Sequence, residues 1–93
     1  MTVYDEIATE VERAEAKFPG QVLPWMNTQP DRYAGLAVAW RWQNDSGRAT
    51  WSSVLMEEVC EALAEDDPRA MRAELIQVAA VVVRMVAQID RGQ

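Results

Sequence analysis

The motif Asp66-Asp67-Pro68 separates two long segments whose apolar residues recur at helical spacing. Aspartate is a favoured N-cap residue, and proline is favoured at the first position of a helix. We therefore expect one helix over residues 51–65, with Thr50 as its cap, and another from residue 68 to residue 89 or 90. A turn this short makes the two helices antiparallel neighbours.

Two further helices are predicted in the first half of the chain. One runs from about Thr2 to Lys17, and the other starts with Asp31 as its N-cap and ends near Asn44. No segment shows the alternating pattern of a half-buried strand. Because 93 residues correspond to one small domain, the sequence predicts a single domain, residues 1–93, built as an all-α bundle of about four helices.

Charge and cysteine content restrict the possible partners. The formal net charge of −6 argues against a nucleic-acid backbone or an anionic membrane as partner. Cys60 is the only cysteine and histidine is absent, which excludes an internal disulfide and a Cys–His zinc cluster and makes Cys60 a small core residue. The acidic N-terminal stretch lacks the apolar region of a signal peptide, so we expect a cytoplasmic protein.

An acidic stripe runs along the segment 51–65. Four glutamates fall on one arc of a helical wheel, opposite an apolar arc and without lysine or arginine among them: Glu57, Glu58, Glu61 and Glu65. Like charges three or four residues apart destabilise a helix by about a few tenths of a kcal/mol per pair. We therefore expect positive charge from outside this helix to balance the stripe.

The following helix offers a matching polar stripe. It carries Glu74 and Gln77, which an antiparallel hairpin would place opposite Glu58 and Glu61. Three carboxylates and an amide oxygen form the hard, all-oxygen ligand set that Mg²⁺ or Mn²⁺ prefers. A solvent-exposed acidic face is the alternative, because such faces are common and EExxE by itself is a weak signal.

The segment Glu57-Glu58-Val59-Cys60-Glu61, followed by Glu74-Leu75-Ile76-Gln77, resembles the EExxE…ExxD signature of the all-α MazG-like nucleoside triphosphate pyrophosphohydrolases. The likeness covers about half the chain. The chain is similar in particular to the short stand-alone members of the family from actinobacteria and their phages. It implies a helical bundle completed by oligomerisation. It also implies Mg²⁺-dependent cleavage of a nucleotide between its α and β phosphates, which yields a monophosphate and pyrophosphate.

The same resemblance implies a role for each acidic residue. Glu58, Glu61 and Glu74 correspond to the metal ligands, and Gln77 stands where the family usually has aspartate. Glu57 and Glu61 are the implied catalytic residues, with Glu57 able to orient or deprotonate the attacking water. The Gln77 amide oxygen can still bind a metal ion, but it brings no charge and cannot act as a base, so metal affinity is expected to fall.

Five residues are candidates for contacting the nucleotide. Lys17 and Arg84 could bind phosphate, whereas Trp25 and Trp42 could contact the substrate from apolar surface. Asn44 could read a base edge. Each has an ordinary alternative. Lys17 could instead be a cation favoured at a helix C-terminus, and Arg84 a salt-bridged arginine. Trp25 and Trp42 could lie in a subunit interface, and Asn44 could be the residue that ends its helix.

Three functions remain open. The first is the enzyme, and the second is a non-catalytic helical oligomer that binds a nucleotide or a protein through the same acidic groove, which Gln77 favours. The third is an adaptor whose acidic face meets a basic partner, for which magnesium would change nothing. The apolar arc over residues 68–90, with Ile76 and Val83, would be poorly covered in a monomer, so we expect a homodimer or homotetramer.

Overall fold

The computed structural model describes residues 1–25 and 29–93. Its α-helices are α1 (Val3–Lys17), α2 (Pro30–Gln43), α3 (Trp51–Ala64) and α4 (Pro68–Asp90), and a π-helical turn, η1 (Asn44–Arg48), joins the end of α2. The described residues contain no strand. The predicted all-α chain with about four helices is therefore confirmed.

Local caps define the starts of α3 and α4, as the sequence predicts. The Thr50 hydroxyl accepts a hydrogen bond from the Ser53 backbone N–H (3.0 Å), and the Ser53 hydroxyl accepts one from the Thr50 N–H (2.8 Å). Asp67 accepts a hydrogen bond from the Ala70 N–H at 3.1 Å, directly before Pro68. These contacts are made within one helical turn, so sequence spacing is enough to predict them.

The predicted N-cap of α2 is wrong by two positions. The helix begins at Pro30, and Gln29 is its N-cap without a side-chain hydrogen bond, so Asp31 lies inside the first turn instead of capping it. Proline has a φ angle that suits the first helical position and lacks the N–H that would be unsatisfied there. The Asp31 carboxylate still lies where the helix dipole favours negative charge.

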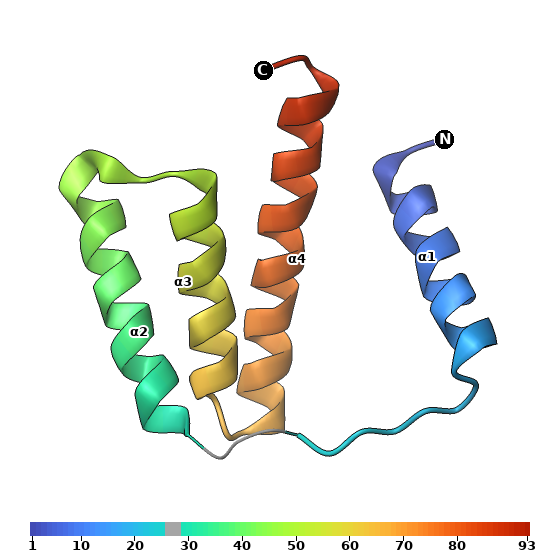
Figure 1. Cartoon of the computed structure of the whole chain (residues 1–93), viewed down its shortest axis with the longest axis horizontal. Coiled ribbons are helices and arrows are strands. Elements are labelled where there is room, and N and C mark those ends of the chain that lie inside the picture. Colours follow the sequence, from blue (N-terminus) through green and yellow to red (C-terminus); the bar gives the residue numbers. More distant parts are fainter. Residues whose placement is uncertain (26–28) are drawn as a thin grey trace.

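The chain after α2 winds more widely than an α-helix, a feature that the sequence analysis did not predict. Within η1, Gly47 has a φ angle of 76°, which lies in the left-handed region that glycine adopts most easily. The chain reverses here and enters α3, so that α2 and α3 lie antiparallel and side by side (Figure 1).

The helices form a flat arrangement. Figure 1 shows α2, α3 and α4 next to one another, with α1 standing apart on the other side of α4. The principal extents are 40 × 38 × 18 Å. The antiparallel pairing of α3 and α4 agrees with the short turn between them. None of the described helices combines the length and hydrophobicity needed to cross a membrane.

The buried apolar core of the described chain is small. Its members are Ala37, Cys60, Ala62, Met71 and Val81. Cys60 is confirmed as a core residue, and burial raises the pKa of its thiol. The core is concentrated where α3 meets α2 and α4, which leaves α1 outside it.

Candidate metal centre

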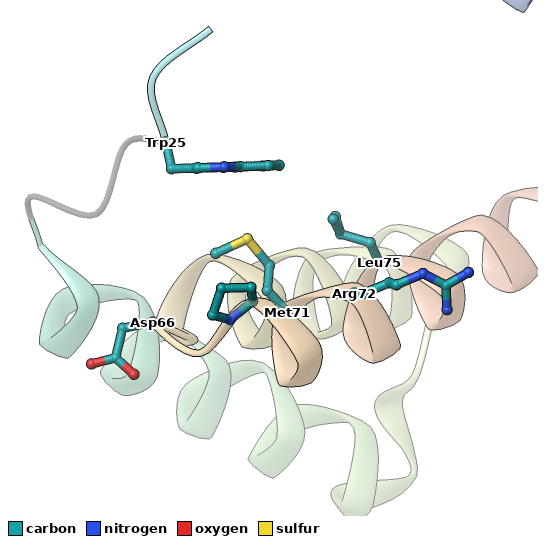
Figure 2. Close-up of a pocket in the computed structure, with 6 residues that line it drawn as sticks. Trp25, Asp66, Met71, Arg72 and Leu75 are labelled. Atoms are coloured by element: carbon teal, nitrogen blue, oxygen red, sulfur yellow. The ribbon is translucent and has the colours of Figure 1, made fainter. Parts of the chain in front are cut away.

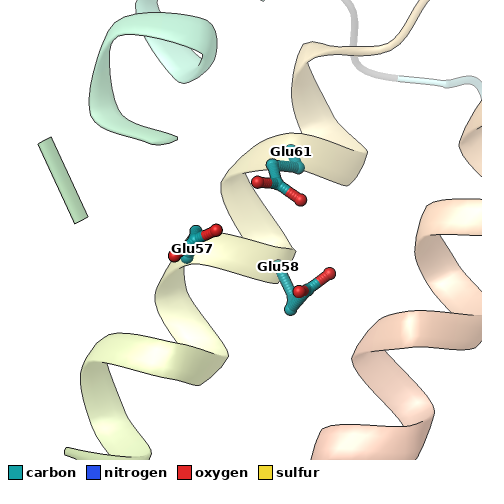
Figure 3. A group of neighbouring side chains, drawn as sticks. All are labelled: Glu57, Glu58 and Glu61. Carbon is teal, nitrogen blue, oxygen red and sulfur yellow. The ribbon is translucent and has the colours of Figure 1, made fainter. Parts of the chain in front are cut away.

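Three glutamates of α3 bring their carboxylates together. Oxygen atoms of Glu57, Glu58 and Glu61, one from each residue, all lie within 4.8 Å of one another, and all three residues are half-buried. Figure 3 shows them on adjacent turns of α3, with Glu58 on the side toward α4. Positions i, i+1 and i+4 of a helix lie on one side, so the helix itself produces this cluster.

Glu57 is held by a small hydrogen-bond network. Asn44, the first residue of η1, donates its side-chain N–H to Glu57 Oε1 at 2.8 Å and to the Ser53 carbonyl at 3.3 Å. The buried Ser53 hydroxyl donates to Asn44 Oδ1 at 2.6 Å. The π-helical turn thus gives Asn44 a structural role, which is to fix the carboxylate of Glu57.

Arg41 of α2 supplies positive charge to two of the glutamates. Its Nη2 donates to Glu61 Oε1 at 2.9 Å, and its Nε lies 3.6 Å from Glu57 Oε2. The expectation of charge from outside the helix is therefore confirmed for Glu57 and Glu61. The sequence analysis did not identify Arg41 as their partner.

Spacing carries a signal that could have identified Arg41. Arg41 and Asn44 are three residues apart, so they share a face, and a short connection to α3 turns this face toward the glutamates. Ser53 was also missed, because only the folded structure shows that its hydroxyl reaches Asn44.

Glu58 lies in an environment that is unfavourable for a negative charge. Burial raises the pKa of its carboxyl. The negative charges of neighbouring carboxylates raise that pKa further: Glu61, then Glu74, then Glu57. A cation at this position would relieve both the repulsion and the cost of burial.

Glu74 of α4 approaches the cluster from the neighbouring helix. It lines a hollow of about 390 Å³ together with Glu61, Glu65 and Arg41. Gln77 is exposed and does not line this hollow. Of the predicted ligands, Glu58 and Glu61 therefore lie in one cluster, and Glu74 shares a hollow with Glu61 and lies near enough to Glu58 to raise its pKa.

Of the predicted nucleotide-contacting residues, Asn44 lies at the glutamates, whereas the two cationic candidates, Lys17 and Arg84, lie elsewhere. Lys17 is at the end of α1, with its Nζ 5.4 Å from the centroid of the Phe18 ring. Arg84 of α4 has its guanidinium 5.1 Å from the centroid of Trp51, whose indole N–H donates to Gln88 at 2.8 Å. The structure does not place Lys17 or Arg84 beside the cluster.

The two candidate tryptophans also lie away from the cluster. Trp42 is exposed, with the Arg48 guanidinium 5.5 Å from its ring centroid. Trp25 borders a pocket of about 340 Å³ at the turn between α3 and α4. Figure 2 shows its ring over Met71 and Leu75, which point toward it from α4.

The ligand chemistry of the cluster fits a hard divalent cation. Its donors are carboxylate oxygens, the type preferred by Mg²⁺ and Mn²⁺, and they are half-buried. Arg41 already pairs with two of these carboxylates, so a bound ion would have to share Glu57 and Glu61 with Arg41 or displace it. No protein-family model, curated protein or solved structure matches the chain.

Proposed function

We propose that the protein is a metal-dependent nucleotide pyrophosphohydrolase that cleaves a nucleoside triphosphate to a monophosphate and pyrophosphate. The observation that carries the proposal is the half-buried cluster of Glu57, Glu58 and Glu61. Glu74 supports it by sharing a hollow with Glu61. The EExxE…ExxQ pattern, which resembles the MazG-like signature, connects these residues with nucleotide cleavage.

In this proposal Glu58, Glu61 and Glu74 would hold Mg²⁺ or Mn²⁺. When bound, the ion would neutralise negative charge on the phosphate oxygens. Placing most of the ligands on one helix, beside a second that contributes Glu74, lets the fold position the carboxylates before any ligand arrives. This preorganisation is what phosphoryl transfer chiefly requires of a protein.

Glu57 is the residue best placed to handle the proton of the attacking water. Asn44 and Arg41 restrict its carboxylate, which stays half-buried. The water oxygen would bond to phosphorus while the bridging P–O bond breaks, and Glu57 would accept the water proton. The bridging oxygen would leave with pyrophosphate.

A non-catalytic nucleotide-binding or protein-binding oligomer is the second candidate. Two observations favour it: Arg41 already neutralises Glu57 and Glu61 within the chain, and Gln77 is exposed. In both cases we infer that the chain acts as a homodimer or homotetramer, supported by exposed apolar residues on α4 such as Ile76 and Ile89.

The test is incubation with a panel of canonical, deoxy and modified nucleoside triphosphates in Mg²⁺ or Mn²⁺, with products identified by mass. We expect a monophosphate and pyrophosphate from the wild type and at least a hundredfold less (~10²) from Glu61→Gln. Glu12→Gln on the exposed face of α1 is the matched control and should retain full activity.

Each other outcome points to a different function. No turnover of any nucleotide, with nucleotide binding retained, would favour the non-catalytic oligomer. Binding of a basic protein that is unaffected by Mg²⁺ would favour the adaptor. Equal activity of wild type and Glu61→Gln would show that these glutamates are not the catalytic site.

A further inference from the structure

The described helices lie in a single layer. An α-helix with its side chains is about 10–12 Å across, and the thinnest extent of the molecule is 18 Å. The radius of gyration is 15.3 Å, compared with about 12 Å for a compact domain of this length. Stable domains bury a core between at least two layers, so both faces of this layer remain open.

The surface area gives the same result in quantitative form. The chain exposes 7223 Å², whereas a folded monomer of its 10.5 kDa exposes about 5,400 Å². The excess of about 1,800 Å² exceeds the roughly 800 Å² that each partner buries in a standard interface. An excess of this size corresponds to the large interfaces of obligate oligomers.

Part of the uncovered apolar surface lies between α1 and α4. A groove of about 480 Å³ separates the two helices, with Ile7, Val11 and Ala14 on one wall and Val86 on the other. The helix α1 has 15 residues and none of them is buried. A helix of this length is marginally stable alone in water, so α1 needs a partner surface along its apolar stripe.

The charges of the two helices indicate what that partner is. The helix α1 has five acidic and two basic residues, a net charge of −3, whereas α4 has three basic and two acidic residues, a net charge of +1. The charged residues that line the groove are Glu6 and Glu10 of α1, so a partner that brings basic residues, as α4 of a second copy does, is favoured there. A second copy of the chain provides both the apolar stripe and the opposite charge.

We propose that a second copy of this chain fills the groove between α1 and α4. The α1–α4 pair of one protomer packs against the α1–α4 pair of its partner, so that four helices enclose a common apolar core. The isologous contact uses the same surface of both copies. The helix α3, which carries the glutamates, lies on the other side of α4 from α1 (Figure 1), so this inference does not depend on the proposed enzymatic function.

The first test measures molecular mass by light scattering and sedimentation equilibrium. We expect the wild type at twice the 10.5 kDa of one chain or a higher even multiple. Val11→Asp in the groove should reduce the mass to that of a smaller species. Val22→Asp is the matched control, because Val22 is 91% exposed in the connector outside the groove.

A second measurement separates a lost interface from a damaged helix. Wild-type chains with and without isotope label are mixed, and nuclear Overhauser effects are recorded between methyl groups of different chains. We expect signals that join Val11 and Val86 of one chain to apolar residues of α1 or α4 in the other. A monomeric wild type overturns the proposal. An oligomer whose intermolecular signals fall outside the groove, or one that Val22→Asp dissociates as well as Val11→Asp does, overturns it too.

Discussion

At the residue scale, Glu58 is the position where folding and ligand binding compete. Its pKa is raised above the ordinary value of 4.5, so the ionised carboxylate opposes folding. This penalty is absent well below pH 4.5, where both the folded and unfolded states are protonated, and it is complete above the folded-state pKa. A carboxylate kept at such a cost is consistent with a ligand that needs its charge.

Glu58→Gln is therefore expected to raise the melting temperature at neutral pH, with the gain disappearing as the pH falls below 4.5. Circular dichroism melts across this pH range measure the effect. In the proposed function, Mg²⁺ raises the melting temperature of the wild type, and this increase is lost in Glu58→Gln. Glu12→Gln should keep the wild-type response. A stability loss in Glu58→Gln at neutral pH would contradict the electrostatic argument.

At the element scale, the start of α3 connects a helix cap to the candidate site. The buried Ser53 hydroxyl closes the capping box with Thr50 and also donates to Asn44, which in turn holds Glu57. The first turn of α3 therefore determines the position of a carboxylate on the second turn. A local capping motif is linked here to a tertiary contact with η1.

Ser53→Ala is expected to destabilise the protein by about 1–3 kcal/mol, because it removes a buried hydrogen-bonding group and half of the capping box. Urea unfolding measures the change. Ser52→Ala is the matched control at the exposed neighbouring position, and its effect should stay within about 0.5 kcal/mol. If the two variants lose the same stability, the network through Asn44 contributes nothing.

At the scale of the whole molecule, folding is expected to depend on association. A single layer of helices leaves about 1,800 Å² more surface exposed than a compact monomer would. The wild-type melting temperature should therefore rise with protein concentration, because mass action favours the folded oligomer. Calorimetry over a dilution series measures how the melting temperature changes with protein concentration. Val11→Asp should make the melting temperature independent of concentration. A melting temperature independent of concentration in the oligomeric wild type would contradict this coupling.

The extent to which the sequence predicts this fold differs between elements. Thr50 and the Asp67-Pro68 pair predict the starts of α3 and α4 because caps act within one turn. The start of α2 was misplaced because Pro30 and Asp31 both carry helix-start signals, and only one can prevail. The turn η1 had no clear signal, because its wide winding depends on Gly47 and on the contacts that Asn44 makes with α3.

The candidate site likewise has a part that the sequence predicts and a part that it does not. Helical periodicity alone places Glu57, Glu58 and Glu61 together, and the structure confirms their proximity. Periodicity also groups Gln77 with Glu74, but only the packing of α4 against α3 shows that Glu74 shares a hollow with Glu61 and that Gln77 is exposed. Arg41 enters the site from α2, and its ion pairs require a helix packing that no local pattern specifies.

The sequence by itself determined the helices, their antiparallel hairpin and the acidic stripe, because hydrogen bonds within a turn and the helical repeat depend on neighbouring residues. The tertiary structure decided that Arg41 and Asn44 hold two of the glutamates, that Glu58 carries a raised pKa, and that α1 stands apart from α3. These properties depend on burial and on distances between residues far apart in the chain, which are established only when the helices pack.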